Sequence, residues 1–181
     1  MNKKIIALVG ETGSGKDTFC RIVESLSPSI LSIRFSEVLT QTLGLFFDEI
    51  KKEDQQWLAN SLRDRFGEDI IMKAVSKKIK EADAQFIIVN GMRVKEEFDF
   101  IKKEGGVVVY ITLDARKRWE RIKNRGEKKD DSVSYEKFLE IDSGRTETQI
   151  KEIGKMADFM IENDKDLNYL EEEIKKIIEK M

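Results

Sequence analysis

The stretch Gly10–Thr18, GETGSGKDT, contains the residue types of this chain with the most definite chemistry. Its glycines allow a tight turn in which successive backbone N–H groups converge on one point, and such a point binds anions. A helical pattern opens at Lys16, and the N-terminus of a helix adds about half a positive charge there. The spacing Gly10-x-x-x-x-Gly15-Lys16 is that of a nucleotide-phosphate loop, whose lysine reaches the β- and γ-phosphates. We therefore predict that this stretch holds the phosphates of ATP.

The residue after Lys16 differs from the general motif. A serine or threonine that touches Mg²⁺ is usual at this position, whereas this chain has Asp17 followed by Thr18. We predict that Asp17 and Thr18 hold the metal. Asp17 can do so through water while Thr18 touches a phosphate, and the sequence leaves the division of these roles open. The predicted nucleotide contacts in this stretch are Gly10, Thr12, Gly13, Ser14, Gly15, Lys16, Asp17 and Thr18.

A strand before the loop and a helix after it are needed to hold this loop in shape. Ile5–Val9 is an apolar, partly β-branched run bounded by glycine, which is typical of a strand buried on both faces of a parallel sheet. The helix that begins at Lys16 is indicated by apolar residues at helical spacing: Phe19, Ile22, Val23 and Leu26. Both neighbours of the loop are therefore present.

Further apolar runs alternate with helical patterns along the chain. We predict strands at residues 30–33, 86–89, 107–111 and 157–161. Strands that alternate with helices indicate a parallel sheet covered by helices on both sides. The segment Asn90–Arg93 directly follows a strand, at the carboxyl edge where open α/β sheets bind ligands.

Residues 36–82 are predicted to form a helical block without a strand of its own. Ser36 is expected to cap its first helix. Helices at about 53–65 and 68–82 complete the block, and the apolar residues expected to face inward include Phe46, Trp57 and Phe66. Three arginines lie at or near its edges, and surface charge and acceptor binding remain equally open for them: Arg34, Arg63 and Arg65.

A basic helix is predicted from Ala115, next to a polar, turn-like stretch at residues 126–134. It places Arg118, Arg121 and Arg125 on one face, because residues three, four and seven apart lie on one side of a helix. The position beside a polar loop favours a ligand-facing cluster, and a solvated helix face is the alternative.

The composition limits the chemistry that this chain can carry. Of its 181 residues, 40% are hydrophobic and 38% charged, with a formal net charge of −2, which gives no indication of a nucleic-acid or membrane partner. No apolar run approaches the ~18 residues of a membrane span, and no signal region precedes the first strand, so we expect a cytoplasmic protein. One cysteine and no histidine exclude disulfides, Cys/His zinc sites and histidine bases. Phosphoryl transfer, which relies on positioning, cations and metal, remains compatible.

Four landmarks in the chain resemble the nucleoside-monophosphate-kinase-like superfamily of P-loop kinases. Within this superfamily, the chain most resembles adenylate-kinase-related and dephospho-coenzyme-A-kinase-like proteins of microbes. The landmarks are the phosphate loop; Val89–Arg93, similar to a strand-end DGxxR; Glu120–Gly126 followed by Asp130 and Asp131, similar to the ERLxxRG…DD entry to a mobile lid; and Ala157–Asn163, similar to ADxxIxN.

The resemblance implies a three-layer α/β fold in which helices flank a five-stranded parallel sheet of kinase-type order 2-3-1-4-5. It also implies a single kinase domain over residues 1–181. Within this domain, residues 36–82 would be a helical acceptor-binding insertion and residues 126–145 a short lid region.

The same resemblance implies roles for individual residues. Arg93 would grip the acceptor phosphate, Arg121 and Arg125 would bind the transferring phosphate and stack on adenine, and Arg145 would be a further lid arginine. Asn163 would lie beside the adenine. The implied catalytic residues are Lys16, Arg93, Arg121, Arg125 and Arg145, and the implied nucleotide contacts outside the phosphate loop are Arg121 and Asn163.

Two positions depart from the family pattern. The strand-end aspartate is Asn90 here, which cannot act as a carboxylate on Mg²⁺-bound water. The arginine just before the Asp-Asp pair is replaced by Lys128 and Lys129, which supply charge but no planar bidentate fork. Both changes favour a protein with weaker transferase activity.

The function expected from the sequence is ATP- and Mg²⁺-dependent transfer of the γ-phosphoryl group to a small nucleotide-like acceptor. A (deoxy)nucleoside monophosphate is the first candidate acceptor and dephospho-coenzyme A the second. A nucleotide-binding switch with little or no transferase activity is the alternative from another class. We expect no nucleic-acid or membrane partner, and a monomer or homodimer.

Overall fold

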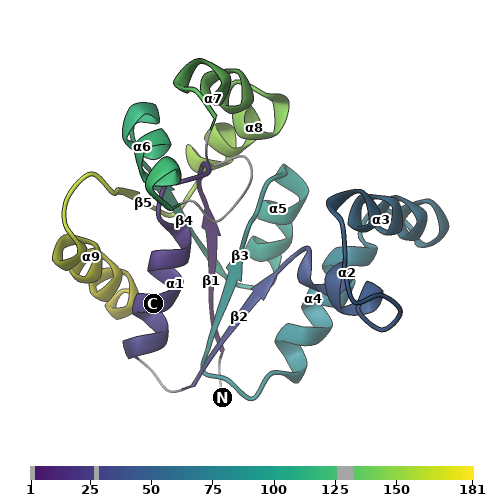
Figure 1. Cartoon of the computed structure of the whole chain (residues 1–181). Coiled ribbons are helices and arrows are strands. Elements are labelled where there is room, and N and C mark those ends of the chain that lie inside the picture. The colour runs from purple at the N-terminus through teal and green to yellow at the C-terminus, as the bar shows by residue number, and fades with distance from the viewer. Residues whose placement is uncertain (1–2, 27–28, 126–132) are drawn as a thin grey trace.

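A five-stranded parallel sheet forms the centre of the protein in the computed structural model (Figure 1). Its strands lie in the order β2-β3-β1-β4-β5, which confirms the predicted kinase-type order. Each is close to a predicted apolar run: β1 (Lys4–Val9), β2 (Ile30–Arg34), β3 (Phe86–Asn90), β4 (Val107–Thr112) and β5 (Phe159–Glu162).

The structure describes residues 3–26, 29–125 and 133–181. Its helices are α1 (Lys16–Leu26), α2 (Glu37–Leu43), α3 (Lys52–Phe66), α4 (Ile70–Glu81), α5 (Lys95–Lys103), α6 (Ala115–Arg125), α7 (Tyr135–Asp142), α8 (Arg145–Gly154) and α9 (Leu167–Glu179). No helix within these residues combines the length and the apolar character that crossing a membrane requires. The short helix α8 was not predicted.

Helices cover both faces of the sheet. Because side chains alternate along a strand, Ile6 and Leu8 of β1 pack against α1 and α9, while Ala7 and Val9 pack on the other face with residues of α4, α5 and α8. Figure 1 shows α1 and α9 together on one side of the sheet. The strand β1 is almost completely buried, as its apolar run predicts.

The strand register brings the carboxyl ends of the strands to one edge of the sheet. Asn90, the last residue of β3, lies opposite Leu8 of β1 and Arg34 of β2. The phosphate loop leaves β1 at this edge. Segments that are far apart in the sequence therefore meet here, as ligand-binding edges of open α/β sheets require.

The helical block α2–α4 differs from the prediction in its interior. Within residues 36–82 a small core contains Leu39, Ala59 and Ile71. Phe46, Trp57 and Phe66, which were expected to face inward, are 74%, 66% and 58% exposed. Only a narrow stripe of each helix faces this small core, and α4 also packs on the sheet through Val75 and Ile79, so an apolar pattern alone overestimates the interior of the block. Ser36 occupies the N-cap position of α2, as predicted, but its side chain makes no capping hydrogen bond.

Cys20 packs in the core beneath the phosphate loop. It is 7% exposed, and the side-chain amide of Asn90 lies 3.6 Å from its Sγ. Burial, together with the nearby charge of Asp17, raises the pKa of the thiol to about 11. Cys20 is thus a packing residue, and its thiolate is strongly disfavoured at neutral pH.

We expect the native protein to resist thiol reagents at about pH 8. A thiol of pKa about 11 is ~0.1% ionised at that pH, against ~25% for an ordinary cysteine, so labelling should slow by at least ~10²-fold. The measurement is the rate of reaction with a colorimetric disulfide reagent, first in buffer and then in denaturant as the control. Equal rates in the two conditions would contradict the buried placement of Cys20.

Candidate functional site

The phosphate loop has a backbone that only glycine can adopt at two positions. Gly13 and Gly15 have φ angles of +84° and +108°, in the left-handed region. A Cβ at Gly15 would also collide with the side-chain amide of Asn163. Ser14 N donates to Glu11 O at 3.1 Å, which closes the turn before α1 begins. The strand, glycine turn and helix predicted from the sequence are therefore present, and the predicted loop residues lie together.

Lys16 lies folded back on its own loop. Its Nζ donates to the carbonyl oxygens of Gly10 and Glu11 at 2.6 and 2.9 Å. Burial, together with the positive charge of Arg93, lowers the pKa of the ammonium to about 8. Both hydrogen-bond acceptors of Nζ are neutral carbonyls, so a phosphate group bound at this loop would give the ammonium a negatively charged partner.

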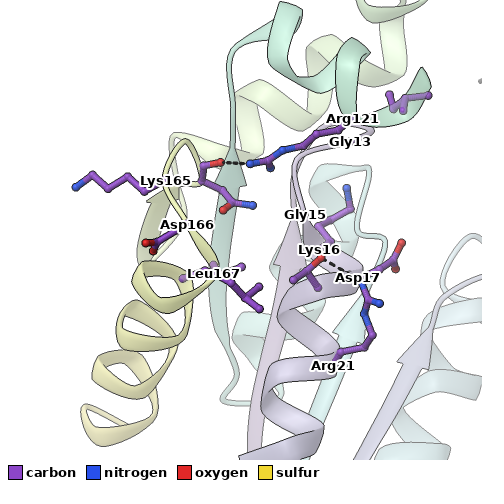
Figure 2. A pocket seen from close by; sticks show the side chains of 13 residues that line it. Gly13, Gly15, Lys16, Asp17, Arg21, Arg121, Lys165, Asp166 and Leu167 are labelled. Carbon is purple, nitrogen blue, oxygen red and sulfur yellow. Dashed lines mark hydrogen bonds between the residues drawn. The ribbon is translucent and has the colours of Figure 1, made fainter. Parts of the chain in front are cut away.

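Asn163 and Arg121, both predicted to contact the nucleotide, lie beside the phosphate loop, and Asn163 contacts it directly. The side-chain amide of Asn163, just after β5, donates to Ser14 O at 2.8 Å. Arg121 of α6 donates through Nη2 to Asn163 O at 2.9 Å. Figure 2 shows Arg121 extending from α6 toward the loop that follows β5. Asn163 thus supports the phosphate loop directly, and Arg121 is held at the rim of the same site.

A first cavity of about 590 Å³ opens between α1, α6 and the segment that joins β5 to α9. It contains predicted nucleotide residues from the phosphate loop together with Arg121 and Asn163. Its lining is Gly13, Gly15, Lys16, Asp17, Thr18, Arg21, Arg121, Ile122, Asn163, Lys165, Asp166, Leu167 and Leu170. Lys16 and Asp17 lie at the loop end of this cavity, Lys165 and Asp166 lie just before α9, and leucines of α9 provide an apolar wall.

A second cavity of about 320 Å³ lies on the other side of the loop, toward the helical block. Arginines from three different elements line it: Arg34 at the end of β2, Arg63 of α3, and Arg93 after β3. Phe35, Leu39 and Ile71 give it an apolar part, and Asn90 and Glu97 are further lining residues. The two cavities share Gly13, Lys16 and Asp17.

Arg93 is fixed through its backbone while its guanidinium stays accessible. Its N–H donates to Glu97 Oε2 at 2.7 Å, and the Arg93 side chain is 55% exposed. Burial raises the pKa of the Glu97 carboxyl. Glu147 of α8 lies 3.9 Å from the guanidinium, too far for a strong ion pair. Arg93 is therefore free to bind an anion in the second cavity.

Arg118 does not belong to a ligand-facing cluster, so the prediction that groups it with Arg121 is wrong. It is 2% exposed and makes a bidentate ion pair with Asp142 of α7 at 2.6 and 2.9 Å. Its Nε donates to Leu113 O at 2.9 Å and its Nη1 to Thr12 O at 3.3 Å. Arg118 thus joins the phosphate loop to α7, which covers it. Arg121, one turn further along α6, is exposed.

Part of the predicted lid region lies outside the described residues. This holds for residues 126–132, which include Lys128, Lys129, Asp130 and Asp131, and for the side chains of Arg125 and Arg145. The described remainder begins with Val133, whose carbonyl oxygen accepts a hydrogen bond of 2.9 Å from Trp119 Nε1. The Trp119 ring lies 5.6 Å from that of Tyr135. The start of this segment is therefore packed on α6.

Some residues that line the cavities were left open or missed in the sequence. Arg34 ends β2 and Lys165 comes shortly after β5, so both lie at the carboxyl end of a strand, which is the same signal that identified Asn90 and Arg93. That signal could have selected both. Arg63 and Arg21 lie on helices, and no local pattern distinguishes them from surface arginines.

Comparison with known proteins gives three findings. A family profile described as an AAA domain matches residues 6–152. A UPF0200 protein of Methanothermobacter thermautotrophicus is 26% identical over 185 residues, which cover 100% of this chain and 92% of that protein. A UPF0200 protein of Thermoplasma volcanium is 30% identical over 178 residues, covering 96% of each chain.

Among solved structures, shikimate kinase from Bacteroides thetaiotaomicron has a similar fold. The TM-score is 0.66, with 13% identity, and the superposition covers 97% of both chains. At this identity the likeness concerns the fold alone. The nucleotide-phosphate loop, the strand order and this neighbour agree on a kinase-like P-loop fold.

Proposed function

This chain belongs to the AAA domain family and to the UPF0200 proteins, and we propose that its two cavities are the donor and acceptor sites of a phosphotransferase. The proposed reaction moves the γ-phosphoryl group of ATP, with Mg²⁺, to a small nucleotide-like acceptor. A (deoxy)nucleoside monophosphate is the first candidate acceptor. Dephospho-coenzyme A is the second.

The observation that carries this proposal is that the two cavities meet at Lys16 and Asp17. A transferase must hold donor and acceptor at once, with the transferring group between them. A nucleotide-binding switch needs only the first cavity. The second cavity, with arginines from three elements, is the type of site that binds a phosphate-bearing molecule.

The residues near the junction fit a divalent cation. Mg²⁺ prefers oxygen ligands and keeps several waters, and the first turn of α1 offers the carboxylate of Asp17 and the hydroxyl of Thr18. Asp17 lines both cavities, whereas Thr18 lines only the first. Asp17 and Thr18 would hold Mg²⁺ together with the nucleotide, and the ion would supply positive charge that neutralises charge developing during transfer.

The chain's own groups then have distinct tasks. The loop amides and Lys16 hold the donor phosphates, and Arg121 lies at the rim of the donor site. Arg34, Arg63 and Arg93 orient the acceptor anion. As transfer proceeds, the bond between the γ-phosphorus and the oxygen bridging to the β-phosphate breaks, and a bond to the acceptor oxygen forms. Segments around both cavities would exclude water, which otherwise competes as acceptor.

A screen of acceptors tests the proposal. The protein is incubated with ATP and Mg²⁺ together with (deoxy)nucleoside monophosphates, dephospho-coenzyme A or shikimate, the last because of the structural neighbour, and phosphate transfer is measured. Transfer to a monophosphate supports the first candidate. ATP binding without transfer to any of these acceptors would favour the switch.

We expect Arg93→Ala to impair use of the acceptor selectively. Losing one hydrogen-bonded contact to a charged group costs about 1.5–3 kcal/mol, so kcat/KM for the acceptor should fall by ~10–150-fold while ATP affinity stays unchanged. The matched control is Arg65→Ala, since Arg65 is an exposed arginine outside the second cavity. An equal loss in both variants, or a loss of ATP binding in Arg93→Ala, would remove Arg93 from the acceptor site.

A further inference from the structure

The acidic group that the kinase pattern places at the end of a strand is present in this site on a different element. The strand-end residue is Asn90, and its Nδ2 donates to Asp17 Oδ1 at 3.3 Å. Asp17 belongs to the first turn of α1. The carboxylate and the amide are therefore neighbours in space, although they are 73 residues apart in the chain.

Asn90 is held so that its amide has a fixed position. It is 4% exposed and ends β3 between β1 and β2, opposite Leu8 and Arg34. Its Nδ2 also lies 3.6 Å from Cys20 Sγ, beneath the loop. A buried amide that is fixed in this way can orient the side chain that it contacts.

Asp17 lies where the two cavities meet, and its other partner is readily exchanged. Arg34 Nη2 donates to Asp17 Oδ1 at 2.9 Å, and the two side chains are 61% and 65% exposed. An ion pair this exposed contributes little to stability. Arg34 can therefore turn to an acceptor anion while Asn90 still holds the carboxylate.

We propose that Asp17 supplies the carboxylate that Asn90 cannot, and that Asn90 is the residue that positions it toward nucleotide-bound Mg²⁺. This inference rests on the proposed phosphotransferase function and extends it to the division of labour between these two residues. Asn90 is then not a deficiency of the site, because it forms a hydrogen-bonded pair with the carboxylate of Asp17. Mutating a residue that orients a metal-binding side chain typically lowers the metal affinity by about 10–100-fold.

The pair explains why an amide suits position 90. An aspartate there would face Asp17 with like charge and without an N–H to donate. The reverse arrangement, with asparagine at position 17 and aspartate at position 90, restores one carboxylate and one amide. The two single changes should therefore be harmful, and their combination should be less so.

The experiment compares the wild-type protein with Asp17→Asn, Asn90→Asp and the double variant Asp17→Asn/Asn90→Asp. Calorimetry measures the affinity for a non-hydrolysable ATP analogue with and without Mg²⁺. Each single change should reduce the Mg²⁺-dependent gain in affinity by about 10–100-fold. The double variant should regain most of this gain, which is taken as the ratio of the affinities with and without metal because each single change also alters the charge beside the phosphates.

The control variant is Glu24→Gln, because Glu24 is an exposed carboxylate of the same helix outside both cavities. It should leave the Mg²⁺ effect unchanged. Thermal unfolding verifies that each variant is folded. If Asn90→Asp fails to fold, Asn90→Leu removes the amide without adding a charge, and the same loss is expected.

Two results would overturn the inference. One is a full Mg²⁺ effect in Asn90→Asp or Asn90→Leu, and the other is a double variant no better than the worse single change. In both, normal binding of the analogue without metal leaves the proposed function standing. If the wild-type protein binds no ATP analogue in either condition, the proposed function fails and this inference fails with it.

Discussion

Replacing Lys16 with methionine is expected to lower the rate of phosphoryl transfer by about 10²–10³-fold, the scale for removing one preorganised electrostatic partner of the reacting group. The lysine is partly buried against its own loop, where its Nζ contacts Gly10 O and Glu11 O. Methionine has a similar length but carries no charge. The measurement is transfer from ATP to the best acceptor of the screen, with Lys103→Met on the exposed side of α5 as the control.

The same lysine should give nucleotide binding a pH signature. Its pKa of about 8 in the free protein lies well below the ordinary value of 10.5, because burial and the charge of Arg93 disfavour the ammonium. Phosphate stabilises the ammonium and so raises this pKa on binding. Below about pH 8 the lysine is already charged, whereas above it binding must take up a proton and affinity falls as the pH rises.

Calorimetry without metal, in two buffers of different ionisation enthalpy, measures this uptake. It should approach one proton at about pH 9 and be small at about pH 7. Lys16→Arg keeps its charge throughout this range and should show no such uptake. Near-native transfer by Lys16→Met, or proton uptake that does not change with pH, would contradict the assignment of Lys16.

The second large effect is expected on stability, from Arg118→Met. The change would leave the Asp142 carboxylate, 8% exposed, without its bidentate partner. Removing one member of a buried ion pair costs about 3–5 kcal/mol. At roughly 2–4 °C per kcal/mol for a chain of this size, the melting temperature should fall by about 6–20 °C.

Lys151 moderates this loss but cannot replace Arg118. Its Nζ lies 3.2 Å from Asp142 Oδ2, and its side chain is 44% exposed. Burial raises the pKa of Asp142, but the bonds from Arg118 and Lys151 outweigh this and hold the pKa below its usual value.

Two further variants complete the stability test. Arg118→Met/Asp142→Leu, which removes both charges, should recover part of the stability. Lys95→Met, which breaks the exposed pair with Asp99 within α5, should change the free energy of unfolding by less than ~0.5 kcal/mol. Equal melting temperatures for Arg118→Met and the wild-type protein would show that the buried pair is not formed in solution.

The parts of the fold that could be predicted from the sequence depend on local patterns. The helix at Lys16–Leu26 follows from a glycine turn and apolar spacing, and β1 from a continuous apolar run. The position of Asn90 and Arg93 at a ligand-binding edge follows from their place directly after a buried strand. These features need no knowledge of which distant segment packs against them.

The parts that could not be predicted depend on distant partners. Arg118 and Arg121 look alike on a helical pattern, but Asp142, 24 residues after Arg118, buries one of them. The contact between Asn90 and Asp17 spans 73 residues. Helix α8 places Ile150 and Ile153 in the core within an otherwise polar stretch, too sparse a pattern to predict a helix.

The two tryptophans of this chain lie on different sides of the site. Trp57 of α3 is 66% exposed on the helical block, while Trp119 of α6 is bonded to Val133 and packed beside Tyr135. An exposed indole and a packed one emit at different wavelengths, so the chain contains two intrinsic optical probes. A Trp57→Phe variant would report spectroscopically on the segment after α6, and a Trp119→Phe variant on the helical block. Stopped-flow emission from the two variants could then time the response at each cavity separately, without an attached dye.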